Sequence, residues 1–147
     1  MSAGPSERGP GRKVVEEEDS AALMLGPDFA EAKCLMTADV ALILEHKRQM
    51  MVQKGVTPKS DFLKAYQYVN TVKQFRDKEI VQQVRSDLEK EHYGLKPFEV
   101  AQLGNLCPQD PQEARALVPS LDMPGRDIDN AQLKVILDNL DALRQIT

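Results

Sequence analysis

The chain has 147 residues, a formal net charge of −4 and a pI of about 5.2, and its aromatic content is 5% with no tryptophan. This length predicts one domain, or one domain with an arm, around an aliphatic core. The acidic balance disfavours a protein that grips DNA by itself. No apolar run approaches the roughly 18 residues of a membrane-spanning helix, and no apolar signal region begins the chain, so we expect neither a membrane protein nor a secreted one.

Residues 1–20 are rich in Gly, Pro and Ser and end in an acidic run at 16–19, so we expect a disordered tail that could at most steer a basic partner. The next segment, Ala21–Leu25, is apolar but too short to stand alone. Two interpretations stay open. The segment folds onto the helical core, or it adds a strand to the edge of another chain's sheet.

Asp28–Leu35 reads as a short helix, and Thr37 as the N-cap of a longer helix over 38–53. Apolar residues of that longer helix recur on one side, at Val40, Ile43, Leu44 and Met51. Leu42 and Met50 add apolar area outside this stripe. The helix therefore has more apolar surface than one packing side can hide, which is typical of a helix with a second, partner-facing side.

Residues 54–60, with Gly55 and Pro58, form a linker. Residues 61–75 follow as a helix with one apolar stripe: Phe62, Ala65, Tyr66, Val69 and Val72. Asp77 is the predicted N-cap of the next helix, whose apolar face consists of Ile80, Val81, Val84 and Leu88, and which we expect to run to about His92 before Gly94.

Residues 98–121 predict two short helices and a tight corner. The first helix ends near Gly104, and Pro108 prevents its continuation. Asp110 is placed as an N-cap, with Pro111 at the first helical position and Glu113 three residues after the cap. Leu106 and Cys107 lie in the corner, where we expect both to be buried.

The last helix follows the N-cap Asp129, with Gln132 at the capping-box position. Its apolar stripe consists of Leu133, Ile136, Leu137, Leu140 and Leu143. Since helical periodicity dominates and alternating β-branched runs are scarce, the sequence predicts an all-α fold whose C-terminal helices, residues 61–147, form a bundle. Cys34 and Cys107 are interpreted as reduced thiols, because no signal peptide accompanies them.

The sequence offers no catalytic residues, no cofactor site and no metal site. His46 and His92 lie on separate predicted helices without further ligands at metal-binding spacing. No nucleophile elbow or phosphate-binding loop is present. Asp138 and Asp141 form a carboxylate pair on the polar side of the last helix, where solubility explains them. We therefore expect a protein that is not an enzyme.

Several short segments resemble, in order and spacing, the family of fourth subunits of eukaryotic nuclear RNA polymerase II. They are Leu44-Glu-His-Lys47, Val84-Arg85-Ser86, Asn105-Leu-Cys-Pro108, Asp110, Glu113-Ala114 and Leu117-Val-Pro-Ser-Leu121. The resemblance covers roughly residues 28–143. It implies that the C-terminal part is an HRDC-like helical domain, a fold also found in helicase tails.

The resemblance further implies a non-catalytic stalk subunit in the nucleus. Such a subunit forms a heterodimer with the seventh subunit, which carries an oligonucleotide-binding barrel, and docks on the polymerase core near the clamp and the RNA exit. It acts in transcription initiation and RNA handling, and it meets RNA mostly through its partner. The partner-binding residues expected on this basis and from the apolar stripe are Leu23, Met24, Leu25, Val40, Ile43, Leu44, His46, Lys47 and Met51.

Three alternatives accompany this interpretation. The chain could be the fourth subunit of a plant silencing polymerase, IV or V, although the Leu-Glu-His-Lys and Asn-Leu-Cys-Pro segments look nearer to the polymerase II type. It could be a free HRDC-like module that binds nucleic acid, which the acidic pI disfavours. It could also be an unrelated helical adaptor, which would make the order of the matching segments a coincidence.

Overall fold

A computed structural model describes residues 17–147 of the chain, so most of the predicted N-terminal tail lies outside the described residues. The described part is helical, and its only strand-like feature is an isolated antiparallel bridge between Asp19 and Met24, which confirms the all-α prediction. The α-helices are α1 (Thr37–Gln53), α2 (Ser60–Val72), α3 (Lys78–Leu88), α4 (Pro97–Leu106), α5 (Pro111–Leu117) and α6 (Asn130–Gln145). Three short 3-10 helices are η1 (Ser20–Ala22), η2 (Glu91–Tyr93) and η3 (Pro119–Asp122).

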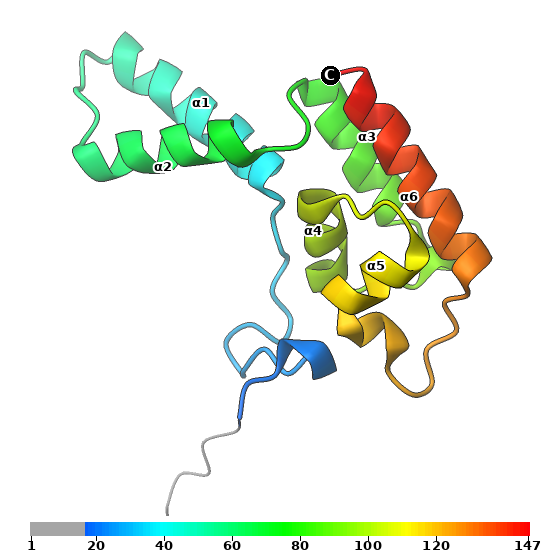
Figure 1. Ribbon diagram of the computed structural model, residues 1–147. Helices are drawn as coiled ribbons and strands as arrows, with labels where there is room; N and C mark the ends of the chain where they lie inside the picture. Colours follow the sequence, from blue (N-terminus) through cyan, green and yellow to red (C-terminus); the bar gives the residue numbers. More distant parts are fainter. Residues whose placement is uncertain (1–16) are drawn as a thin grey trace, which may run out of the picture.

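Helices α3 to α6 form the bundle, and α6 packs along α3 and α5 (Figure 1). The predicted apolar stripes of α3 and α6 face its interior, where Val84 and Leu133 are fully buried. Burying such a side chain contributes about 1.5–3 kcal/mol to folding. The core cluster consists of Met36, Ala38, Phe75, Val81, Val84, Leu88, Tyr93, Val100, Leu103, Cys107, Ala114, Val118, Leu121, Ile128, Leu133, Ile136, Leu137 and Leu140.

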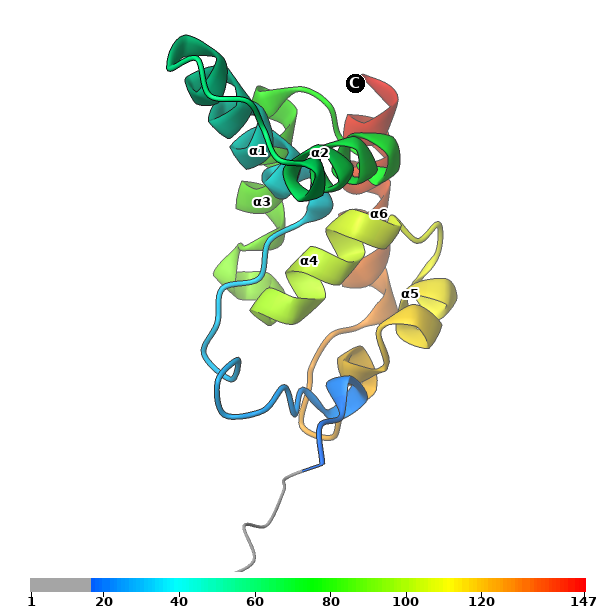
Figure 2. The same cartoon turned by 90° about the vertical axis from the view of Figure 1, so that its left-hand side faces the viewer.

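Helices α1 and α2 form an antiparallel hairpin that stands beside the bundle (Figures 1 and 2). The main packing neighbour of α2 is α1. Val69 of α2 is buried and Phe62 and Tyr66 are half-buried, whereas Ala65 and Val72 of the predicted stripe are exposed. The division of the chain into a linker at 54–60 and a domain at 61–147 stays a prediction.

The segment before α1 does not form the predicted helix over Asp28–Leu35. Residues 27–31 are turns and the following residues run extended alongside α4 (Figure 2). An isolated helix of eight residues is marginal in water, because few hydrogen bonds offset the cost of its nucleation. Tertiary contacts decide instead. The Cys34 carbonyl accepts a hydrogen bond from Arg85 Nη2 at 3.1 Å, which holds the extended backbone to α3.

The helix ends show which capping predictions the structure confirms. Asp110 accepts a hydrogen bond from Glu113 N at 2.9 Å, and Asp129 accepts one from Gln132 N at 2.6 Å. Asp77 precedes α3 as predicted, but its side chain makes no capping hydrogen bond. The predicted extension of this helix to His92 is wrong, because α3 ends at Leu88 and η2 continues the chain toward Gly94.

The corner between α4 and α5 separates Cys107 from Leu106. Cys107 is buried, as predicted, but the prediction for Leu106 is wrong because its side chain is 44% exposed. Cys107 takes a left-handed conformation with φ of 44°, so the chain turns sharply and only one of the two neighbours can point inward. Burial raises the pKa of the Cys107 thiol to about 11, which keeps it protonated at neutral pH.

A buried ion pair fastens the loop between η3 and α6 to α4. Glu99 is fully buried and accepts two hydrogen bonds from Arg126, at 2.8 and 2.7 Å. Ser120 Oγ and Lys96 N also donate to it. Burial alone would raise the pKa of Glu99, but these hydrogen bonds and the Arg126 charge outweigh burial, and its pKa lies below the ordinary value.

Candidate partner-binding surface

The outer face of α1 gathers most of the residues that the sequence predicts to contact a partner. Ile43 is 53% exposed, and Met50, about two helical turns further on, is 38% exposed. His46 and Lys47 are exposed beside them. Val40, Leu44 and Met51 are half-buried at the edges of this face. The face therefore presents contiguous apolar surface with a lysine and a histidine among it.

The opposite side of α1 is occupied by α2, which leaves the outer face free for another molecule. Ala41 is buried, and Ala38, at the start of the helix, belongs to the core cluster of the bundle. The Tyr66 hydroxyl of α2 donates a hydrogen bond to Glu45 at 2.5 Å, and Arg48 lies 5.4 Å from the centre of the Tyr66 ring. The hydrogen bond from Tyr66 is the main cause of the lowered pKa of Glu45.

The first turn of α1 is anchored on the bundle by two polar contacts. Thr37 N donates to Asn105 Oδ1 of α4 at 2.8 Å, which satisfies a backbone donor that a helix start leaves unpaired. Arg85 of α3 forms an ion pair with Asp39. Asp39 also accepts from Met36 N at 2.8 Å. These contacts fix the start of α1 and, with it, the direction in which the hairpin points.

A close steric fit completes this anchorage. Met36, fully buried, lies over Gly104 of α4. A Cβ atom added at Gly104 would overlap the Met36 sulfur and lie 3.0 Å from its Cγ atom. Glycine at this position therefore lets the chain before α1 pass directly over α4, and a larger residue would displace it.

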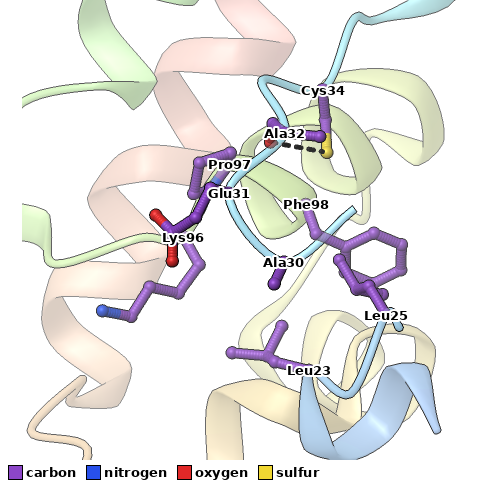
Figure 3. Close-up of a pocket in the computed structure, with 9 residues that line it drawn as sticks. All are labelled: Leu23, Leu25, Ala30, Glu31, Ala32, Cys34, Lys96, Pro97 and Phe98. Carbon is purple, nitrogen blue, oxygen red and sulfur yellow. Dashed lines mark hydrogen bonds between the residues drawn. The ribbon is translucent and has the colours of Figure 1, made fainter. Parts of the chain in front are cut away.

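The predicted N-terminal part of the surface lies apart from α1, at the other end of α4. Leu23 and Leu25 line a pocket of about 400 Å³ together with Phe98 of α4 (Figure 3). Met24 is 47% exposed and its backbone pairs with Asp19 in the isolated bridge. Through η1 the segment contacts η3 of the bundle. In the described chain it is a turn folded onto the bundle, and pairing with another chain's sheet stays a proposal.

The described residues contain no group of His, Cys, Asp or Glu side chains with the arrangement of a metal site. None of the helices within residues 17–147 is long and apolar enough to cross a membrane.

Comparison with known proteins assigns the chain to a family. The family model described as RNA polymerase Rpb4 matches residues 34–144. DNA-directed RNA polymerase II subunit 4 of Arabidopsis thaliana is 39% identical over 134 residues, which cover 88% of this chain and 96% of that protein. The chain belongs to the RNA polymerase Rpb4 family.

Two further relatives are DNA-directed RNA polymerase II subunits rpb4. The subunit of Dictyostelium discoideum is 31% identical over 90% of this chain and 92% of its own length. The subunit of Schizosaccharomyces pombe is 33% identical over 90% of this chain and 96% of its own length. The Rpb4 family is a non-catalytic polymerase subunit family, so this chain is a component of transcription machinery and not an enzyme.

The segments that resemble the Rpb4 family coincide with the anchorage of the hairpin. Asn105 of the Asn-Leu-Cys-Pro segment holds the start of α1, and Arg85 of the Val-Arg-Ser segment pairs with Asp39. Glu45 of the Leu-Glu-His-Lys segment binds Tyr66 within the hairpin. These segments therefore hold helices together, while Ile43 and Met50 outside them supply the exposed apolar surface.

Sequence reasoning missed the polar contacts across the chain. Asp39 and Arg85 are 46 residues apart, and Glu99 and Arg126 are 27 apart, so no local pattern links them. One signal was available for Glu99. It stands three residues after Lys96 at the start of a helix that begins with proline, a position where a glutamate accepts from the backbone.

Proposed function

We propose that this chain is the stalk subunit of nuclear RNA polymerase II, paired with the seventh subunit through α1 and the Leu23–Leu25 segment. The heterodimer docks on the polymerase core near the clamp and the RNA exit, in the nucleus. It acts in initiation and in RNA handling, with RNA bound mostly by the barrel of the partner. The relatives at 31–39% identity are subunits of polymerase II by name, which favours this enzyme over a silencing polymerase.

One observation carries the proposal of a partner on the N-terminal half. Among the described residues, fourteen large apolar side chains are exposed, and ten of them lie between Met24 and Val72. The other four are Leu106, Leu117, Val135 and Ile146. Large exposed apolar surface marks interaction sites, and here it concentrates on the arm and the hairpin.

The test is co-purification with the seventh subunit after a matched pair of substitutions. Ile43→Asp places a charge on the outer face of α1, and Val135→Asp places one on α6 of the bundle. Both side chains are 53% exposed in the chain alone, so the two variants cost similar stability when unbound. We expect Ile43→Asp to abolish the complex, because binding would bury the new carboxylate in the interface without a counter-charge. Val135→Asp should leave the complex intact.

Circular dichroism of each lone variant checks that the fold persists. Equal binding by both variants would show that α1 is not the contact. The half-buried Leu44 offers a second probe, since Leu44→Asp disturbs both the hairpin and the proposed contact. A chain that never captures the seventh subunit would refute the pairing itself.

Hydrogen exchange tests the part of the proposal that concerns Leu23–Leu25. If this segment joins the partner's sheet, its amides become protected in the complex well beyond their protection in the lone chain. Equal protection in both states would restrict the contact to α1.

A further inference from the structure

Although the net charge of the chain is −4, its basic residues are concentrated in one stretch of the sequence. Residues 37–78, which hold the hairpin and the link to α3, contain eight Lys and Arg against four Asp and Glu. Residues 1–36 contain four against seven, and residues 79–147 seven against twelve. Residues 37–78 are thus a basic segment in an otherwise acidic chain.

Two of the four acids in residues 37–78 are engaged within the chain, whereas Asp61 and Asp77 form no ion pair with any residue in 17–147. Asp39 is paired with Arg85, and Glu45 accepts hydrogen bonds from Tyr66, Gln49 and Arg48. By contrast, seven of the eight cations in this segment form no ion pair with any residue in 17–147: Lys47, Lys54, Lys59, Lys64, Lys73, Arg76 and Lys78. The charge that this segment offers to another molecule is therefore mainly positive.

Four of these unpaired cations lie on or near the apolar outer face of α1. Lys47 stands within that face, and Lys54 and Lys59 lie at the tip of the hairpin between α1 and α2. Lys78, at the start of α3, lines a groove of about 480 Å³ on α1, and the other lining residues are Leu42, Ile43, Glu45, His46 and Gln49. An apolar centre with a charged rim is the usual composition of a protein–protein contact.

We propose that the surface which covers this face is an acidic protein surface with an apolar centre. This inference rests on the proposed function, because it specifies the chemistry that the partner must bring to α1. A protein fits the face better than a nucleic acid does. Helix α1 contains no Phe, Tyr or Trp on which bases could stack. The exposed Ile43 and Met50 side chains are buried favourably only against apolar groups of another protein.

Charge complementarity of this kind acts chiefly on the rate of association and on its dependence on salt. The test uses the full chain and the seventh subunit, with association measured by stopped-flow fluorescence. The hairpin variant is Lys47→Glu with Lys78→Glu. The control is Lys90→Glu with Lys134→Glu, which changes the net charge equally on exposed positions of the bundle. Both lysines are exposed; Lys134 pairs with exposed Asp138 and Lys90 with half-buried Asp87, and such pairs near the surface contribute little to stability.

The wild-type association rate should fall by about tenfold or more between about 0.05 and about 0.5 M NaCl, since salt screens the attraction. At low salt the hairpin variant should associate about tenfold more slowly than wild type, and the control within about twofold. At high salt the three proteins should converge.

Four outcomes would overturn the inference. If the complex forms at a rate that does not depend on salt, the proposed function stands, but the partner surface is not acidic. Equal slowing by the control would show that only the net charge matters. If the hairpin variant associates normally but loses binding of a single-stranded RNA oligonucleotide, the cations serve nucleic acid instead. Failure of wild type to form the complex would refute both proposals together.

Discussion

The α1–α2 hairpin and the α3–α6 bundle use apolar residues in opposite ways. In the core cluster, all residues except Met36 and Ala38 lie at position 75 or beyond. The exposed large apolar side chains lie mostly before position 73. A bundle that hides its apolar stripes is stabilised from within, whereas a hairpin that exposes them gains most from a second molecule. The two regions should therefore respond differently to substitution.

The largest expected effect is on the bundle, at the buried ion pair. Arg126→Ala leaves the Glu99 carboxylate buried without its cation, which should lower the free energy of unfolding by about 3–5 kcal/mol. Urea unfolding followed by circular dichroism measures the loss. Arg144→Ala is the control, because Arg144 pairs with Asp141 near the surface and should cost less than about 1 kcal/mol. Similar losses in both variants would mean that burial of Glu99 adds nothing.

Acid should weaken the same pair, though less than removal of Arg126 does. The pKa of Glu99 is lower in the folded chain than in the unfolded chain. Its contribution to stability is therefore complete above the unfolded pKa of about 4.3 and is lost as the pH falls through the lower, folded pKa. Thermal unfolding from pH 7 to pH 2 should show this loss, and Glu99→Gln should flatten the acid limb while lowering stability at pH 7. If Glu99→Gln loses stability between pH 7 and pH 2 as the wild type does, titration of Glu99 does not contribute to the loss.

The next effect concerns the anchorage between the two regions. Gly104→Ala should lower the free energy of unfolding by about 1–3 kcal/mol, because the new methyl group displaces Met36. Alanine's better helix propensity, about 1 kcal/mol, offsets part of this loss. Met36→Ala should cost less in the Gly104→Ala background than in the wild type, and a double-mutant cycle by urea unfolding gives this coupling. Strict additivity would show that the two side chains do not collide.

The smallest effect tests the corner. Leu106→Ala should cost less than about 1 kcal/mol, because its side chain is largely outside the core. Leu103→Ala, one turn earlier and fully buried, should cost about 2–5 kcal/mol. Urea unfolding of the two variants compares them directly. Equal costs would restore the original prediction that Leu106 is core.

Local chemistry made much of this fold predictable. Asp110 and Asp129 mark helix starts because a carboxylate there satisfies free backbone donors, whatever the rest of the chain does. The stripe of α6 was predictable for a similar reason, since helical spacing alone gathers Leu133 and Leu140 on one side. The exposed apolar surface of α1 was predictable only in part, because Ile43 belongs to the predicted stripe whereas Met50 lies outside it.

The extended run before α1 and the position of α2 could not be predicted, because they depend on contacts between residues far apart in the sequence. The extended run before α1 is held by Arg85 and by the passage over Gly104, which no local pattern encodes. The position of α2 depends on which helix Phe62 and Tyr66 pack against. In the folded chain α2 packs against α1. The roles of Lys47 and Ile43 toward a partner stay predictions, because they concern a molecule outside this chain.

The backbone of Leu23 makes the N-terminal turn, residues 19–25, conformationally strained. The Leu23 backbone is left-handed, with φ of 56° and ψ of 24°, a conformation that costs a leucine about 1 kcal/mol or more. Any motion that straightens residues 19–25 releases this stored strain and so returns part of the energy spent in breaking the bridge. The closed turn is thereby kept easy to open. A glycine at position 23 would remove the strain but would also remove the half-buried Leu23 side chain from the pocket beside α4.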